Sequence, residues 1–175
     1  GGSVEIICAK RNSSHKPKTE KVKKQLLYEK RINYNSFNKF NLRIDNTKKT
    51  LNFFLSNVSK QNIIAYGAST KGNIVLNHCE INNKQIKYIC DANPYKYNRY
   101  TPGSNLKIIS KKEMRQKNPK YLLVLIWSFR KEVIKQELSF LKKGGKLIFH
   151  LPIFHIIDKK NYKKFLKSDF ESLSY

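Results

Sequence analysis

The sequence is poor in residues that impose special backbone geometry or covalent chemistry. It has seven glycines, five prolines, three cysteines, one tryptophan and one methionine in 175 residues. The cysteines, Cys8, Cys79 and Cys90, are odd in number and lack the spacing of a metal site. They predict buried thiols in a reducing compartment, and they argue against a disulfide framework or a zinc site.

Long apolar runs are also missing. The longest, Tyr121–Trp127, is far shorter than the ~20 residues that a membrane helix needs. The first residues, Gly1 to Glu5, lack the charged region and apolar stretch of a signal peptide. These absences predict a cytoplasmic protein without a membrane partner.

Acidic residues are scarce, since 12 Asp and Glu stand against 36 Lys and Arg and the net charge is +24. A basic balance of this kind is typical of nucleic-acid binders. However, Lys supplies 30 of the basic residues and Arg only 6, whereas nucleic-acid readers favour the planar fork of Arg. Lys, Asn, Ile, Tyr and Phe make up 86 of the 175 residues, and a gene rich in A and T gives that composition with no nucleic-acid partner. We expect weak attraction to polyanions in general and no specific nucleic acid.

The first third of the chain, residues 1–60, is predicted to form a strand, a linker and two helices. Ser3–Ala9 is apolar and β-branched, which favours a strand, and residues 10–18 are polar with breakers. A helix is predicted from Thr19 to about Asn33. In a second helix, capped by Ser36, apolar residues recur every three or four positions and are expected to dock on the domain that follows; they are Phe37, Phe40, Ile44, Leu51, Phe54, Leu55 and Val58.

Residues 61–157 alternate short apolar strands with helical segments. The strands are apolar throughout instead of alternating, which is typical of a parallel sheet covered on both faces. The sequence therefore predicts an α/β, Rossmann-like domain with a five-stranded, mostly parallel sheet. The expected strands are 62–66, 86–90, 106–109, 121–127 and 146–150, and the expected helices include 74–79, 110–117 and 129–141. Residues 158–175 form a Lys-rich tail with a helix near 162–166.

The turn after the first of these strands has the composition of an anion site. Ligands of open α/β sheets bind at the carboxyl ends of the strands. Two glycines let the backbone approach a ligand, and the following helix presents free N–H groups and a positive dipole end. The predicted binding residues of this turn are Gly67, Ala68, Ser69, Thr70, Lys71, Gly72 and Asn73. A tight turn without a ligand is the alternative.

The turn departs from two known nucleotide motifs. Ser69 stands where the Gly-x-Gly-x-x-Gly motif of dinucleotide sites has its middle glycine, which weakens an NAD site. Lys71 precedes Gly72, although the lysine of a P-loop follows its glycine.

Other candidate binding residues follow the later strands. Asp91 ends the second strand, where an acid commonly accepts hydrogen bonds from sugar hydroxyls, but Asp-Ala-Asn-Pro is equally good Asx-turn chemistry. The next loop carries Asn93, Lys96 and Tyr100 and either closes over a ligand or connects strands. Trp127 ends the fourth strand and either stacks on a ligand or belongs to the core.

The sequence offers no catalytic constellation. The four histidines have no spacing that brings them to a carboxylate or cysteine, and no nucleophile elbow, paired carboxylates or metal motif is present. We assign no catalytic residue and no chemical step to this chain.

Five blocks of sequence, taken in order, resemble the C-terminal domain of sugar C-methyltransferases that use S-adenosylmethionine. They are Tyr66-Gly-Ala-Ser-Thr-Lys-Gly-Asn73, Asp91-Ala-Asn-Pro94, Tyr100-Thr-Pro-Gly103, Leu125-Ile-Trp127 and Gly144-Gly145. Gly1-Gly2-Ser3 also resembles the stretch that closes the family's methyl-transfer domain. The family often has Asn after the Trp, where this chain has Ser128, so the substrate is left open.

The resemblance implies that different domains of the enzyme bind the cofactor and the substrate. In this family, metal-binding and cofactor-binding domains come first, and the C-terminal domain helps to hold a nucleotide-linked keto-sugar. The resemblance implies that S-adenosylmethionine and the residues that remove the proton lie outside this chain, and that the chain alone is inactive. An NAD-type redox domain is the first alternative, and a basic nucleic-acid-binding module is the second.

Overall fold

The computed structural model describes residues 5–16, 18–60 and 62–168. The chain divides within helix α2 (Tyr34–Ser56) into one unit up to Ile44 and another from Asp45 onward. The first unit contains α1 (Thr19–Glu29), none of whose residues is buried, and the beginning of α2.

The expected strand Ser3–Ala9 is not formed over residues 5–9, which have no regular secondary structure. Its first two residues, Ser3 and Val4, lie outside the described part of the chain. A strand needs a neighbour to pair its backbone N–H and C=O groups, and apolar sequence alone does not supply one.

The predicted start of α2 is wrong by three residues. Asn33, not Ser36, is the capping residue, because the Asn33 Oδ1 accepts the Ser36 N–H at 3.1 Å. The Ser36 hydroxyl accepts the Asn33 N–H in return at 3.3 Å, which gives a reciprocal cap at the start of the helix. The helix before it ends at Glu29, four residues earlier than expected.

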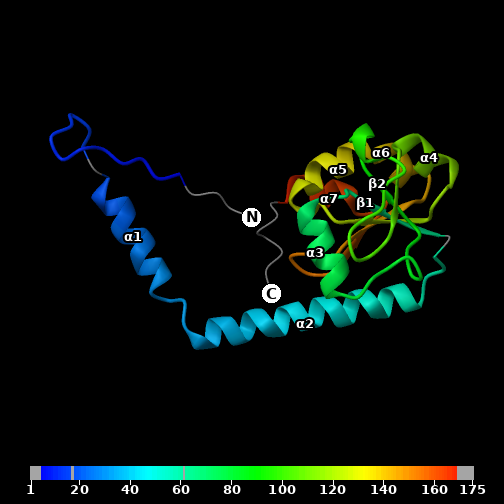
Figure 1. Ribbon diagram of the computed structural model, residues 1–175, viewed down its shortest axis with the longest axis horizontal. Helices are drawn as coiled ribbons and strands as arrows, with labels where there is room; N and C mark the ends of the chain where they lie inside the picture. The colour runs from blue at the N-terminus through cyan, green and yellow to red at the C-terminus, as the bar shows by residue number, and fades with distance from the viewer. Residues whose placement is uncertain (1–4, 17, 61, 169–175) are drawn as a thin grey trace. The chain divides into compact units, whose positions relative to one another are not determined.

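The second unit is built on one sheet whose strand order is β3-β2-β1-β4-β5-β6. Figure 1 labels β1 and β2 of this sheet. Neighbouring strands from β1 to β5 pair in parallel, and β6 pairs with β5 antiparallel. The Rossmann-like prediction is confirmed, with six strands in place of five. The strands are β1 (Ile63–Tyr66), β2 (Tyr88–Cys90), β3 (Lys107–Ile109), β4 (Tyr121–Val124), β5 (Lys146–Phe149) and β6 (His155–Ile157).

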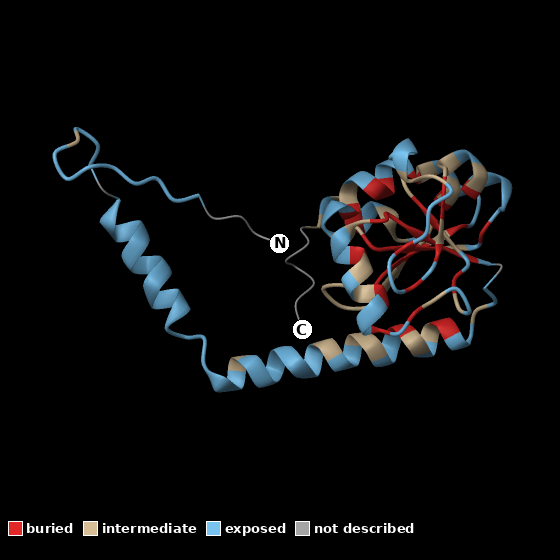
Figure 2. Ribbon diagram, viewed as in Figure 1, coloured by how far each residue is buried: buried red, intermediate tan, exposed pale blue. Residues whose placement is uncertain are grey.

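Helices cover both faces of the sheet, whose strands are mostly buried in Figure 2. Successive β1 residues point to opposite faces, so Ile63 and Ala65 pack with α2 and α3 whereas Ile64 and Tyr66 pack with the later helices. This two-sided burial explains the continuous apolar strands. The remaining helical elements are α3 (Thr70–His78), η1 (Pro94–Lys96), α4 (Lys111–Gln116), η2 (Trp127–Phe129), α5 (Arg130–Gln136), α6 (Leu138–Lys142) and α7 (Tyr162–Lys167).

The single helix predicted over residues 129–141 is broken at Glu137. This residue has non-helical dihedral angles, φ −104° and ψ 17°, and separates α5 from α6. Its side chain is fully buried and accepts hydrogen bonds or ion pairs from Tyr66, Lys111 and Arg115. The periodicity of apolar residues contains no signal for such a buried charge.

The Lys-rich tail is folded over its first part. Phe165 of α7 is only 8% exposed, and the Arg130 Nη2 donates to the Ser168 carbonyl at 3.1 Å. The helix expected near residues 162–166 is present, and residues 169–175 lie outside the described part of the chain.

Two cysteines fulfil their prediction and one does not. Cys79 and Cys90 are buried, and burial raises the pKa of their thiols to about 11 and about 12. Cys8 is exposed, contrary to the expectation of a buried thiol. Among the described residues, no helix combines the length and apolar character needed to cross a lipid bilayer.

Candidate functional site

The fold places two loops side by side at the carboxyl edge of the sheet. Strand β1 lies between β2 and β4, so the chain reverses its direction of winding there, and the loops after β1 and β4 meet at that point. Such reversals are where open α/β sheets bind ligands.

The loop after β1 needs both of its glycines. Gly67 has φ +93°, and a Cβ there would lie 2.6 Å from a side-chain carbon of Ile126 in the loop after β4. A Cβ at Gly72 would lie 2.9 Å from the Cβ of Leu125, so α3 packs against the sheet more closely than a larger residue permits. The Ile126 side chain therefore packs directly against Gly67 between the two loops.

Ser69 caps α3. Its Oγ accepts the Gly72 N–H at 3.0 Å, and its carbonyl accepts the Asn73 N–H at 2.9 Å. The backbone N–H groups of Thr70 and Lys71, the first two residues of the helix, donate to no acceptor within the described residues. These two amides, together with the helix dipole, are the donors available to an anion.

Asp91 organises the turn from the next strand. Its Oδ2 accepts the Ala68 N–H at 2.8 Å and lies 3.3 Å from the Lys96 Nζ, and its Oδ1 accepts the Asn93 N–H at 2.9 Å. The i to i+2 bond to Asn93 is an Asx turn, which was one of the two interpretations of this residue. With three donors from its own chain, the carboxylate has little capacity left for a sugar hydroxyl.

Lys96 links the loop after β2 to the turn after β1. Besides its contact with Asp91, the Nζ donates to the Ala68 carbonyl at 2.8 Å, while its side chain keeps 39% exposure. An ammonium group has three donors, so one is left for a ligand.

A cleft with a volume of about 470 Å³ opens beside the amino end of α3. It is large enough for a substantial part of a nucleotide-sized ligand. Five of the residues predicted from the sequence line it, namely Ala68, Ser69, Thr70, Asn73 and Lys96. The other lining residues are Thr101, Pro102 and Ile108.

The buried oxygen of Asn73 is the clearest unsatisfied polar atom in the cleft. Its Oδ1 is inaccessible to solvent and has no hydrogen-bond partner among the described residues. Burying a polar atom without a partner is costly. Because solvent does not reach this oxygen, the Asn73 amide would have to turn toward the cleft before a ligand could bond to it.

The wall of the cleft that Thr101 and Pro102 form was not predicted as a site, although both residues lie in the Tyr-Thr-Pro-Gly block. The Thr101 hydroxyl lies 2.6 Å from that of Ser104, and both are buried. Asn77 of α3 holds this wall in place, since its Nδ2 donates to the Pro102 carbonyl at 3.1 Å. The signal available in the sequence was the turn chemistry of Pro102-Gly103, which fixes the wall without indicating a ligand.

The other predicted site residues lie outside the lining of this cleft. Lys71 is exposed on α3, Asn93 caps η1 by accepting the Tyr95 N–H, and Tyr100 pairs with Lys107 in an isolated bridge. Trp127 is half-buried and packs its ring edge against His150, with centroids 5.0 Å apart.

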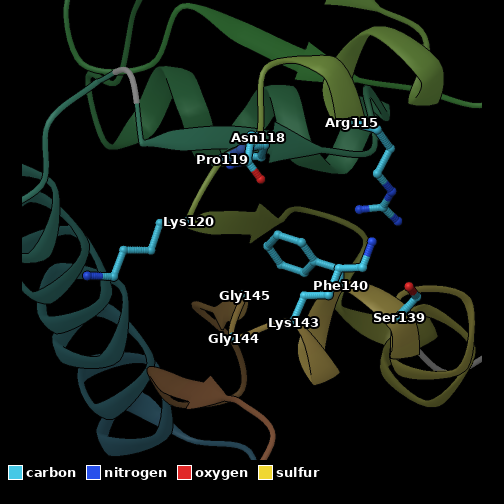
Figure 3. A pocket seen from close by; sticks show the side chains of 9 residues that line it. All are labelled: Arg115, Asn118, Pro119, Lys120, Ser139, Phe140, Lys143, Gly144 and Gly145. Carbon is cyan, nitrogen blue, oxygen red and sulfur yellow. The ribbon is translucent and has the colours of Figure 1, made fainter.

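A second cavity of about 340 Å³ lies at the opposite, amino edge of the sheet (Figure 3). Its lining is basic, with Arg115, Lys120 and Lys143, and Figure 3 shows the Arg115 guanidinium near the Phe140 ring. Helices α4 and α6 end here. The negative end of a helix dipole favours nearby cations, which explains the basic lining without a ligand.

Titratable groups of the fold are mostly engaged in structure. Burial first, and then the Glu137 carboxylate, raise the pKa of the Tyr66 hydroxyl, and burial lowers the pKa of His150 to about 4. No cluster of three or more metal-ligating side chains occurs among the residues that the structure describes.

Comparison with known proteins gave three findings. The sequence model of the family described as C-methyltransferase C-terminal domain matches residues 1–152. C-methyltransferase NovU of Streptomyces niveus is 31% identical over 99 residues, which are 57% of this chain and 24% of that protein. The chain thus spans about a quarter of that relative's length. The crystal structure of UDP-D-quinovosamine 4-dehydrogenase from Vibrio fischeri aligns with a TM-score of 0.38 and 15% identity, over 63% of this chain and 88% of that one.

Proposed function

Because the chain belongs to the C-methyltransferase C-terminal domain family, we propose that it holds the nucleotide-sugar substrate of a sugar C-methyltransferase while other domains transfer the methyl group. The observation that carries this proposal is the cleft at the amino end of α3, which is lined both by Thr70, whose amide is unused, and by Lys96 with its ammonium group.

The substrate's diphosphate would bind at the start of α3. The N–H groups of Thr70 and Lys71 would donate to phosphate oxygens, and the positive end of the helix dipole would favour the charge. Lys96, which lines the cleft, would supply the counter-charge to the diphosphate, whereas Lys71 does not line it. Hydrogen bonds that involve a charged partner are the stronger kind, so these contacts would supply most of the affinity.

The rest of the substrate would lie along the loop after β2. Asn73 lines the cleft, and its amide, once turned toward the ligand, would bond to a hydroxyl of the sugar or an N–H of the base. Asp91 would act as a positioning residue, because it holds both Ala68 and Lys96 in place. Asn93 and Tyr100 would shape the loop without touching the diphosphate.

The cleft does not suit S-adenosylmethionine. Apart from the buried oxygen of Asn73, its free groups are amide donors and an ammonium, and the nearest carboxylate, Asp91, is already engaged with three donors. The sulfonium and ammonium of that cofactor need acceptors or negative charge instead. We therefore place the cofactor on other domains of the enzyme and derive no step of methyl transfer from this chain.

A titration of the chain with ADP, CDP, GDP, UDP and dTDP, and separately with S-adenosylmethionine, tests the proposal. We expect at least one nucleoside diphosphate to bind with a defined stoichiometry, and the cofactor to bind more weakly or not at all. Preferential binding of S-adenosylmethionine would overturn the assignment. Tripolyphosphate serves as the control, since a chain of net charge +24 attracts polyanions without a specific site.

A further inference from the structure

The loop after β4 flanks the start of α3 on the side opposite the loop after β2. Strand β1 pairs in parallel with β2 on one side and with β4 on the other, so the loops after these three strands share one edge of the sheet. Ile126 of the loop after β4 packs against Gly67 of the turn. Ligands of such sheets lie across the point where the strand order reverses. The residues that follow Ile126 are therefore placed to meet the end of a ligand that the loop after β2 does not hold.

Trp127 and Ser128, the next two residues, combine a flat apolar ring with unused polar groups. Both are half-buried, so part of each side chain reaches the surface of the second unit. Neither the indole N–H nor the Ser128 hydroxyl is hydrogen-bonded to another described residue, and neither is shielded from solvent. A pyranose has C–H groups on its faces and hydroxyls around its rim. It matches an aromatic ring that has a donor and a hydroxyl beside it.

A buried histidine supports the Trp127 ring from the interior. His150 follows β5 and is 1% exposed, and the two ring planes lie 79° apart with centroids 5.0 Å from each other. The Val124 carbonyl lies near the imidazole, but neither ring nitrogen has a hydrogen-bond partner of good geometry among the described residues. The contact with the indole is therefore made by the ring itself, in the edge-to-face geometry that aromatic pairs favour.

The loop after β2 offers little to the hydroxyls of a sugar. Asp91 already accepts three donors from its own chain. The hydroxyls of Thr101 and Ser104 are buried and lie 2.6 Å apart, so they bond to each other. The amide of Asn73, once turned toward the cleft, has a donor and an acceptor side by side, which suits the edge of a nucleobase. The free groups on the two sides of α3 thus favour a base beside β2 and a sugar beside β4.

Building on the function proposed above, we propose that the sugar of the substrate stacks on the Trp127 ring and bonds to the Ser128 hydroxyl, and that His150 is the positioning residue for that ring. The nucleoside keeps the loop after β2, and the diphosphate at the start of α3 lies between the two ends. All of these residues belong to the second unit, so the arrangement is complete without residues 1–44.

Fluorescence of the full chain tests this inference directly, because Trp127 is its only tryptophan. The chain is titrated with the nucleoside diphosphate that it binds best and, separately, with the glucosyl ester of that diphosphate. Both ligands carry the same base, so their absorption of the exciting light is matched. We expect the ester to change the intensity or wavelength of the emission, and the nucleoside diphosphate to leave both nearly unchanged. Free glucose at the same concentrations is the control for a solvent effect.

Calorimetric titration of variants separates contact from positioning. Trp127→Ala should weaken binding of the ester about threefold to tenfold more than binding of the nucleoside diphosphate. Phe129→Ala, which truncates an exposed aromatic residue of the same loop, is the matched control and should leave the ratio of the two affinities unchanged. His150→Leu should lower this ratio as Trp127→Ala does, whereas His150→Phe keeps a flat ring and should restore both the ratio and the emission response.

Two fluorescence results would overturn the inference. An equal change of emission with both ligands would put the nucleoside at Trp127, and no change with an ester that calorimetry shows to be bound would mean that the ring makes no contact. If His150→Phe behaves like His150→Leu, the positioning role is wrong. If no nucleoside diphosphate binds at all, the proposed function itself fails, and the sugar site fails with it.

Discussion

Glu137 places a fully buried charge at the centre of a set of ion pairs and hydrogen bonds. It is 0% exposed and joins three elements, through Tyr66 of β1 and through Lys111 and Arg115 of α4. Both cations keep partial contact with solvent, at 44% and 37% side-chain exposure. The carboxylate therefore serves as the common acceptor at the junction of α5 and α6.

Removing that charge should destabilise the protein. For Glu137→Gln we expect a loss of about 2–4 kcal/mol in the free energy of unfolding, because breaking a buried ion pair leaves charges uncompensated. Urea denaturation measures the loss. Glu132→Gln, at an exposed position of the neighbouring α5, is the control and should change the free energy little. Equal unfolding free energies of the two variants would refute a structural role for the ion pairs of Glu137 with Lys111 and Arg115.

His150 should make the protein sensitive to acid. Burial lowers the pKa of its imidazole from 6.5 to about 4, helped by the nearby His155 and opposed by the Val124 carbonyl. Below pH 6.5 the His150 imidazole takes up a proton in the unfolded chain but not in the folded chain. The free energy of unfolding is therefore unaffected by this group above pH 6.5, and it falls as the pH is lowered toward 4. The slope from this group is at most about 1.4 kcal/mol per pH unit.

The variant His150→Leu tests this titration. Its stability relative to the wild type should rise as the pH falls from 7 to 4, because the proton-linked loss has been removed. Thermal unfolding at a series of pH values measures the difference, and His78→Leu at an exposed position controls for the loss of one histidine. A stability difference between His150→Leu and the wild type that does not change with pH would contradict the lowered pKa of His150.

The sequence indicated part of the site at the level of single residues. Ser69, Thr70, Asn73 and Lys96 could be predicted because a strand-to-helix turn and the next strand end must share one edge of the sheet. The engagement of Asp91 by its own backbone could not, since an Asx turn and a sugar-binding acid use the same residue type. The sequence proposed both Lys71 and Lys96, and it could not show that only Lys96 lines the cleft, because that depends on how the loop after β2 folds back.

Helix α2 shows at the scale of an element how burial divides one amphipathic segment. Leu51 is fully buried, whereas Phe53, two residues later, is 73% exposed. We expect Leu51→Ala to cost about 2–5 kcal/mol of unfolding free energy, since it leaves a cavity in the core. Phe53→Ala on the same helix should stay within about 0.5 kcal/mol of the wild type. Similar losses in the two variants would mean that α2 does not pack as described.

Elements with strong local signals were predicted, and those that depend on distant contacts were not. Strands β1, β4 and β5 are continuous apolar runs, and Ser110 begins α4 with a reciprocal cap to Glu113 that the sequence pattern announces. Strand β6 has only three residues and gains its strand character by pairing antiparallel with β5. The end of α5 depends on Glu137 reaching partners on α4 and β1, which are far away in sequence.

At the scale of the whole molecule, the described buried apolar core lies within one of the two units. Every hydrophobic residue that the structure describes as buried lies at or after Leu51, so the described residues before Asp45 contribute none of them. A chain that begins at Asp45 should therefore unfold within a few degrees of the full chain in calorimetry. A chain that begins at Asn62 loses Leu51 and Leu55 and should unfold at a clearly lower temperature. A large loss already in the first truncation would show that residues 1–44 support the core.

At the same scale, we propose that the free amides at the start of α3 bind the substrate's diphosphate. Pro is favoured at the first position of a helix and has no N–H, so Thr70→Pro removes one of these donors while preserving α3. Ser69 already has the extended conformation that a following Pro requires, with φ −98° and ψ 160°. Thr70→Ala keeps the amide and loses only the hydroxyl, which makes it the matched control.

The most direct measurement is calorimetric titration of both variants with the nucleoside diphosphate that binds the wild type best. A hydrogen bond to a charged group contributes about 1.5–3 kcal/mol, so Thr70→Pro should bind roughly tenfold to a hundredfold more weakly than Thr70→Ala. Equal affinities, with both variants folded, would contradict the claim that diphosphate binds at these amides.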